Sequence, residues 1–192
     1  MQTERQVQIV EASIEIIAAK GIQGLTIKNL SKEIGISEPA IYRHFDSKTE
    51  ILLTILNNFK EMASFLGGMM TVNQGTAFEK IDFMFSRIID IFSDTPSFIS
   101  VIFSEELFRN EEVLQQKVVE ILEMNETTVE QIIQLGQDNN EVRTDIDSKT
   151  LALIVMGSLR FSVKLWDLKG VKKDLKKEGE KLISNLKMIL TK

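Results

Sequence analysis

Four neighbouring side chains have the chemistry needed to bind duplex DNA: Tyr42, Arg43, His44 and Lys48. An arginine offers a planar fork that pairs with the O6 and N7 atoms of guanine, so Arg43 is a candidate for reading base edges. A small side chain such as Ala40 allows close approach to a thymine methyl group. Hydroxyl, imidazole and ammonium groups bind phosphate oxygens and thereby fix the register of a protein on the duplex. These side chains need an element that presents them together to a groove.

Residues 26–48 predict such an element, because they read as two short helices joined by a tight turn. The apolar residues of the first helix recur at spacings of three and four, at Ile27, Leu30 and Ile34. Thr26 is a typical N-cap, and Gly35 supplies the left-handed residue that ends the helix. Two helices so close must cross at roughly 90–120°, as in a helix-turn-helix whose second helix enters the major groove.

The second helix is predicted to begin after Ser37, with Pro39 in its first turn. Helical spacing turns Ile41 and Phe45 inward, and the remaining side chains outward. From this geometry we predict base contacts from Arg43 and Ala40 and phosphate contacts from Tyr42 and His44. The complete set of predicted DNA-binding residues is Thr26, Lys28, Ser37, Pro39, Ala40, Tyr42, Arg43, His44 and Lys48.

Lys48 occupies an unusual position for a cation. Ser47 and Glu50 have capping-box spacing, which places Lys48 in the first turn of the next helix, where the helix dipole favours acids. A lysine beside amides that attract anions is explained if a phosphate docks there. Thr26 and Lys28 are predicted to hold the neighbouring backbone in the same way. The alternative for both lysines is a solvated surface position.

The first sixty residues resemble the DNA-binding region of the TetR family of bacterial transcriptional regulators. The resemblance rests on five segments, namely Ile9 to Gly21, Leu25-Thr26, Gly35-Ile36-Ser37, Ala40 to Phe45, and Ser47-Lys48. It implies a helix-turn-helix head on a divergent helical body, and it fades beyond about residue 65.

Two positions within this resemblance bear on DNA contacts. It implies that Tyr42 and Lys48 hold the DNA backbone. Pro39 departs from the family, which often has a small residue at that position, so no base preference is transferred from the family.

Charge and composition limit the other functions open to the chain. Its 192 residues are 43% hydrophobic and carry a net charge of −5, while residues 1–50 hold six basic and seven acidic groups. Such a head indicates a few placed phosphate contacts rather than a polycationic surface. With no cysteine and a single histidine, His44, the sequence offers no thiol site and no catalytic arrangement. We therefore expect no enzyme activity, no cofactor and no metal.

Helical periodicity dominates the chain and predicts an all-α protein of about nine helices. We expect a DNA-binding domain over residues 1–50 and a ligand-binding and dimerisation domain over residues 51–192. The first two long helices are predicted over about residues 3–20, burying Val7, Val10, Ile14 and Ile17, and from Lys48 to about Phe65. Breaks are expected at Gly67-Gly68, Thr95-Pro96, Gly136 to Asn140, and Gly170. No apolar run reaches the length of a membrane span or a signal peptide, which predicts a cytoplasmic protein with no membrane partner.

Phenylalanines recur at helical spacing in the body, and such a stripe commonly forms plain core. The family resemblance, however, implies a ligand cavity among the body helices. The predicted lining residues are Phe85, Ile89, Phe103, Met124, Thr128 and Phe161. Phenylalanine lining favours a hydrophobic effector. For a polar residue such as Thr128, the alternative is an ordinary hydrogen bond at the surface or between helices.

The last two helices carry long apolar stripes, and Gly157 and Ser158 allow another helix to approach closely. The resemblance implies that these helices pair with their copies in a four-helix interface. The predicted interface residues are Ile154, Gly157, Ser158, Phe161, Leu165, Leu182, Leu186 and Ile189.

Together these features predict a homodimeric, ligand-responsive regulator that binds a near-palindromic operator in double-stranded DNA. We expect a repressor that a small hydrophobic effector releases from DNA. The alternative is a DNA-bound architectural or division-control factor of the same fold that senses no effector.

Overall fold

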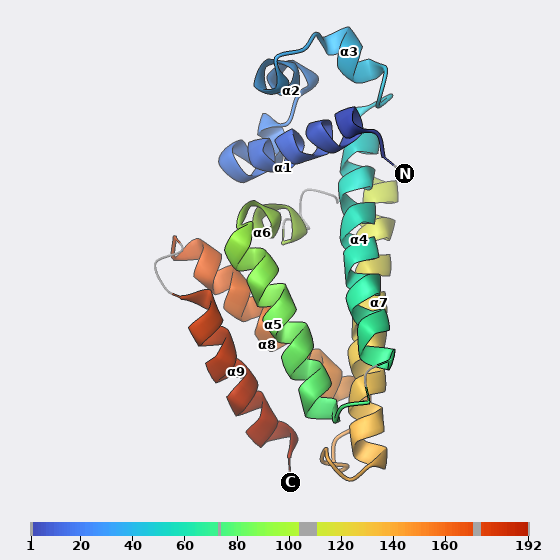
Figure 1. Cartoon of the computed structure of the whole chain (residues 1–192), viewed down its shortest axis with the longest axis vertical. Coiled ribbons are helices and arrows are strands. Elements are labelled where there is room, and N and C mark those ends of the chain that lie inside the picture. Colours follow the sequence, from blue (N-terminus) through green and yellow to red (C-terminus); the bar gives the residue numbers. More distant parts are fainter. Residues whose placement is uncertain (1, 73, 104–110, 171–173, 192) are drawn as a thin grey trace. The chain divides into compact units, whose positions relative to one another are not determined.

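The computed structural model describes residues 2–72, 74–103, 111–170 and 174–191. Within these ranges all regular structure is helical and there is no strand, which confirms the all-α prediction (Figure 1). The helices are α1 Glu4–Gly24, α2 Ile27–Ile34, α3 Glu38–Tyr42, α4 Lys48–Val72, α5 Ala77–Asp94, α6 Ser97–Ile102, α7 Glu112–Asp138, α8 Ser148–Leu168 and α9 Leu175–Leu190.

The chain folds as two compact units. The first comprises residues 1–61 and 97–120, and the second comprises residues 62–96 and 121–192. Each of the long helices α4 and α7 therefore contributes one part to each unit.

In the first unit, α1 packs against α2 and α6. Val10, Ile14 and Ile17 are buried as predicted, but Val7 is 41% exposed, so the prediction for that residue was wrong. In this turn of α1 the buried residue is Ile9 instead, and its side chain is fully covered.

In the second unit, α5 packs against α9 and α8, which also contact each other. The α5–α9 contact is close at Gly179, where a Cβ atom would lie 2.1 Å from the Cδ1 atom of Ile89. Phe85, Ile89 and Phe92 of α5 are all buried. These side chains give the second unit an apolar interior.

The predicted break at Gly67-Gly68 was wrong, because α4 continues through both glycines to Val72. Gly67 is buried, and a Cβ atom there would lie 3.4 Å from a methyl carbon of Thr128 in α7. The glycine therefore serves as a packing contact between helices. The breaks predicted at Thr95-Pro96 and Gly170 are confirmed, since α5 ends at Asp94 and Gly170 has a φ of +72° after α8.

Candidate DNA-binding site and helical body

The structure forms the predicted helix-turn-helix from two short helices, of which α2 is capped by a side chain. Thr26 caps α2, with its hydroxyl oxygen accepting a hydrogen bond from the Asn29 amide at 3.1 Å. Gly35 ends α2 with a φ of +74°. The turn closes when the amides of Gly35 and Ile36 both donate to the Ser31 carbonyl oxygen at 3.0 Å. These local hydrogen bonds bring α3 directly after α2.

The short helix α3 is anchored from inside. The side chains of Ile41 and Phe45 are 0% and 2% exposed, as their spacing predicted. Ser37 has the extended backbone of an N-cap residue, but its hydroxyl makes no capping hydrogen bond. With the inner face fixed, the side chains of the opposite face are held outward.

The predicted DNA-binding residues lie on α2, α3 and the adjoining turns, or at the start of α4. Exposed side chains are those of Thr26, Lys28, Ser37, Pro39, Tyr42 and Arg43, while Ala40, His44 and Lys48 are half-buried. Tyr42 is 50% exposed despite its large ring. The His44 carbonyl oxygen accepts a hydrogen bond from the Gln6 side-chain amide at 3.3 Å, which ties the end of α3 to α1.

Lys48 does more within the chain than the sequence indicates. Its ammonium group donates a hydrogen bond to the Ile22 carbonyl oxygen at 3.0 Å, across 26 residues of sequence. Partial burial lowers the pKa of Lys48 from its usual value. Lys48 therefore ties the start of α4 to the last turn of α1. Because an ammonium group has three donors, this bond leaves donors for a phosphate.

The cap of α4 also differs in detail from a capping box. The Ser47 hydroxyl accepts a hydrogen bond from the Glu50 amide at 3.1 Å, as the spacing predicted. The Glu50 carboxylate, however, reaches past the Ser47 amide and accepts from the Asp46 amide.

The predicted effector residues fall in both units. Phe85 and Ile89 are buried on α5, and Met124 and Thr128 are half-buried on α7, all in the second unit. The Thr128 hydroxyl donates to the Met124 carbonyl oxygen at 2.9 Å, so its hydrogen bond stays within α7. Phe103 follows α6 in the first unit and is half-buried.

Phe161, predicted for both the effector site and the dimer interface, is 69% exposed on α8. It belongs to a stripe of exposed apolar side chains along this helix. The stripe consists of Leu153, Ile154, Phe161, Leu165 and Leu168, and Met188 and Ile189 of α9 are exposed as well. Gly157 lies within the stripe, and a Cβ atom added there would meet nothing within 4 Å in the single chain.

Leu186 does not contribute to this surface, although the sequence predicted that it would. Only 2% of it is exposed. The reason is that α9 turns Leu175, Leu186 and Leu190 toward the interior of its own chain, where all three are buried. Leu182, also predicted at the interface, is half-buried.

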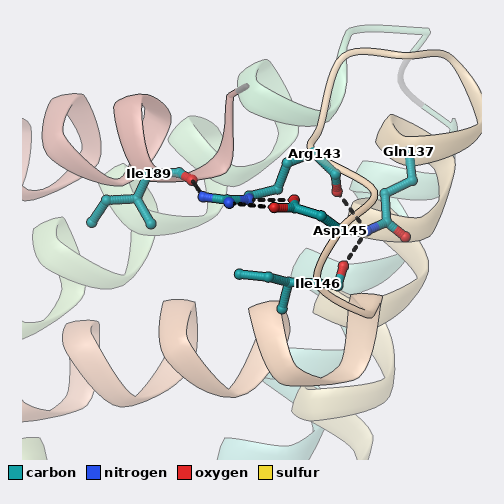
Figure 2. Close-up of polar contacts among 5 residues, drawn as sticks. All are labelled: Gln137, Arg143, Asp145, Ile146 and Ile189. Atoms are coloured by element: carbon teal, nitrogen blue, oxygen red, sulfur yellow. Dashed lines mark hydrogen bonds and ion pairs between the residues drawn. The ribbon is translucent and has the colours of Figure 1, made fainter.

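A polar cluster that sequence reasoning missed fastens the α7–α8 loop to the end of α9 (Figure 2). Arg143 binds both carboxylate oxygens of Asp145, at 2.7 and 2.6 Å, and the pair raises the pKa of Arg143. The Arg143 guanidinium also donates to the Ile189 carbonyl oxygen at 3.3 Å, and its backbone amide donates to the Leu190 carbonyl oxygen at 2.8 Å. Gln137 holds the loop by donating to the carbonyl oxygens of Arg143 and Ile146.

This cluster suits the physics of a helix end. The last carbonyl groups of a helix lack partners and carry partial negative charge, which a cation stabilises. An Arg-x-Asp sequence after a predicted helix end is the only local signal of it, and nothing in the sequence indicates that the partner is α9.

The described residues contain no group of three or more His, Cys, Asp or Glu side chains arranged to hold a metal ion. Of the helices that the structure describes, none has the length and apolar character required to span a membrane.

Comparison with known families accounts for nearly the whole chain. Residues 9–55 match the family described as bacterial regulatory proteins, tetR family. Residues 59–189 match the family described as YsiA-like protein, C-terminal region. The chain therefore belongs to the TetR family of bacterial regulatory proteins. Members of this family are DNA-binding transcriptional regulators that dimerise and bind small-molecule effectors.

Known relatives cover most of this chain. The fatty acid metabolism regulator protein of Bacillus subtilis is 25% identical over 174 residues, which is 89% of this chain and 88% of the relative. The nucleoid occlusion factor SlmA of Vibrio campbellii is 22% identical, covering 84% and 83% of the two chains. Neither relative is named for an enzyme activity.

Among solved structures, FadR of Bacillus subtilis in complex with stearoyl-CoA matches with a TM-score of 0.81 and 22% identity. The match covers 94% of this chain and 96% of that one. At this level of identity the likeness shows a shared fold.

Proposed function

We propose that the protein is a dimeric, ligand-responsive transcriptional repressor whose effector is a hydrophobic molecule with a long acyl chain. The observation that carries this proposal is the similarity of the body, residues 51–192, to known proteins. Residues 59–189 match the YsiA-like C-terminal region, and the B. subtilis relative named as a regulator of fatty acid metabolism aligns over 89% of this chain. The structure determined with stearoyl-CoA adds a neighbour of the same fold that binds an acyl compound.

We assign DNA binding to residues 1–50, where the predicted contact residues surround α3, and effector binding and dimerisation to residues 51–192. The helix α3 has only five residues, Glu38–Tyr42, so one head offers a small contact surface. Two heads about 34–36 Å apart, or a multiple of this, would read a near-palindromic operator. The nearly balanced charge of the head makes cooperation between two heads more important.

Support for the dimer comes from the apolar stripe on α8, centred on Gly157 and Phe161. A row of exposed apolar side chains along one helix is costly in water and is typical of a surface that another protein covers. In a twofold interface the same stripe meets its own copy. The open space over Gly157 in the single chain then leaves room for close approach of the partner helix.

The helix α4 provides the connection that regulation requires. It begins at Lys48 in the head and continues to Val72 in the second unit. An effector that binds one arrangement of the body more tightly than another would shift the population of that arrangement, and α4 would carry the shift to the head. An effector with equal affinity for both arrangements would change nothing.

This function can be tested with the purified full-length protein. Genomic fragments that it protects from nuclease would supply the operator, and fluorescence anisotropy would measure its affinity for that operator. Addition of stearoyl-CoA is expected to weaken operator binding at least tenfold, while free coenzyme A has no effect. If no acyl compound between C8 and C20 changes the affinity, the effector part of the proposal is wrong.

A second candidate is a DNA-bound division-control factor, because the relatives include nucleoid occlusion factors from Vibrio. The fatty acid regulator aligns over 89% of the chain, against 84% for the Vibrio factors, so we place this candidate second. It predicts many binding sites spread over the chromosome and no response to acyl compounds, whereas the first candidate predicts a few sites beside regulated genes.

A further inference from the structure

Gln6 in α1 uses both ends of its side-chain amide. The amide oxygen accepts a hydrogen bond from the Thr3 backbone amide at 3.0 Å, and the Gln6 backbone amide donates to the Thr3 hydroxyl oxygen at 3.2 Å, which together form the capping box of α1. The amide nitrogen donates to the His44 carbonyl oxygen at 3.3 Å, across 38 residues of sequence. Because the two partners require opposite atoms of the amide, they select one orientation of this side chain.

Glutamine is needed for only one of these two tasks. A capping box accepts either glutamate or glutamine at this position. An ionised glutamate accepts hydrogen bonds but has none to donate, so it would face the His44 carbonyl oxygen without a bond. The cap therefore does not explain why residue 6 is glutamine, whereas the bond to His44 does.

The bond reaches the chain directly after α3, the helix to which we assign DNA recognition. This helix has only five residues and packs against α2. His44 directly follows Tyr42 and Arg43, whose side chains are exposed. A hydrogen bond to the His44 carbonyl oxygen therefore fixes the end of α3 that carries these two side chains.

The helix α1 can support this bond because its own N-terminal end is held to α4. The start of α1 lies beside α4 (Figure 1), and the Gln2 side-chain amide donates to the Asn58 side-chain oxygen at 2.7 Å. The helix α3 is thus fastened from inside by the buried Ile41 and Phe45, and at its end by Gln6.

We propose that Gln6 is a positioning residue for DNA recognition, whose amide holds the end of α3 in the orientation that the groove requires and does not itself touch DNA. The inference rests on the proposed assignment of DNA recognition to α3, and it adds a residue outside the helix-turn-helix that controls specificity. Binding groups must be held within about 0.5 Å of their productive geometry, and a helix that is held in advance loses less freedom on binding. A loosened α3 should therefore lose affinity mainly for the sequence that it reads.

The test measures the affinity of the full-length protein for its operator and for scrambled DNA by fluorescence anisotropy. Gln6→Glu keeps the cap and removes the donor to His44, while Gln6→Met removes the donor without adding charge. For both variants we expect the operator affinity of the dimer to fall about fivefold to a hundredfold, because each of the two heads loses one hydrogen bond. The affinity of Gln6→Met for scrambled DNA should change less than about threefold.

Thr3→Ala is the matched control, because it weakens the cap of α1 but leaves the Gln6 side chain and its bond to His44 in place. It should lower the unfolding temperature of the protein and leave the operator affinity within about twofold of the wild type. A loss of operator affinity as large as that of Gln6→Met would show that only the stability of α1 matters, and it would overturn the inference.

Hydrogen exchange of the free protein gives a readout that does not depend on DNA. The amides of His44 and Phe45 donate to the Ile41 carbonyl oxygen at 2.9 and 3.1 Å. In both Gln6 variants these amides should exchange at least about threefold faster than in the wild type, because the end of α3 opens more often. Exchange at the wild-type rate would show that Gln6 does not hold this end, and it would overturn the inference.

The outcomes separate this inference from the proposed function. Wild-type protein that selects an operator, together with Gln6 variants that bind it as tightly, overturns the inference alone. Equal losses on operator and scrambled DNA for Gln6→Met would indicate that residue 6 contacts the DNA backbone directly, and they also overturn the inference alone. Wild-type protein that prefers no genomic fragment overturns the proposed function and this inference together.

Discussion

Replacing Phe161 with alanine should dissociate the dimer without harming the fold. The ring is 69% exposed on α8 in the single chain, so about 140 Å² of a phenylalanine surface of about 200 Å² is available to a partner. At about 25 cal/mol per Å² this surface is worth about 3.5 kcal/mol, of which an alanine retains about 1 kcal/mol. A twofold interface contains the residue twice, so full coverage of both rings gives a loss of about 5 kcal/mol. Coverage of half of each ring gives about 2.5 kcal/mol, which raises the dimer dissociation constant about sixty-fold.

Sedimentation equilibrium over a range of protein concentrations measures this dissociation constant directly. Phe65→Ala is a matched control, because Phe65 is 68% exposed on α4 and lies outside the α8 stripe. We expect the control to remain as dimeric as the wild type. The affinity of Phe161→Ala for the operator should fall at low protein concentration and recover at high concentration, where the dimer reforms.

Two results would refute this reasoning. One is an unchanged dissociation constant for Phe161→Ala, which would show that the ring is not covered by a partner. The other is an equal loss for Phe161→Ala and Phe65→Ala, which would show that the effect is general apolar exposure rather than a specific interface.

Three further predictions concern the head, the packing of the helices and the response to pH. In fluorescence anisotropy, Lys48→Met should weaken binding to every DNA sequence and reduce the slope of log affinity against log salt by about 1 per head. Arg43→Ala should instead change the preference between operator and scrambled DNA. Equal losses on both sequences for Arg43→Ala would contradict its assignment to base reading. In urea unfolding, Gly68→Ala should stabilise the protein by up to about 1 kcal/mol, because nothing lies within 4 Å of the added methyl group. Gly136→Ala should destabilise it by about 1–3 kcal/mol, because two side chains lie 2.6 Å from the added methyl group. The reverse order of stability would refute the packing described for these two glycines. Hydrogen bonds from two lysines lower the pKa of Glu120 from 4.5 to about 2, so its contribution to stability is present above pH 4.5 and is lost as the pH falls toward 2. The difference in unfolding midpoint between wild type and Glu120→Gln should therefore shrink over that range, and a difference that grows on acidification would contradict the prediction.

Much of the head could be predicted from sequence because its signals are local. Thr26 caps the helix that it precedes, Gly35 adopts the left-handed conformation that ends it, and Ile41 and Phe45 turn inward by helical spacing. Each of these outcomes depends on residues within one or two turns. Backbone geometry and apolar periodicity suffice to specify them.

Glycine was harder to interpret, since one residue type serves opposite purposes. Gly35 ends a helix, whereas Gly67 lies inside α4, where it allows α7 to approach at Thr128. The two cases differ in what packs against the glycine, and that neighbour comes from a distant part of the chain. Exposure has the same limitation, as shown by Val7 and Leu186, whose burial depends on which side of the helix a neighbour covers.

The sequence alone determined the helical class, the helix-turn-helix and the family. All three depend on short-range patterns of caps, turns and apolar spacing. Only the tertiary structure decided which distant groups the polar side chains contact. Lys48 bonds to a carbonyl oxygen 26 residues away, and Arg143 reaches the end of α9. The free energy of a charged group depends on the dielectric and the partners around it, and folding brings both from segments far apart in the chain.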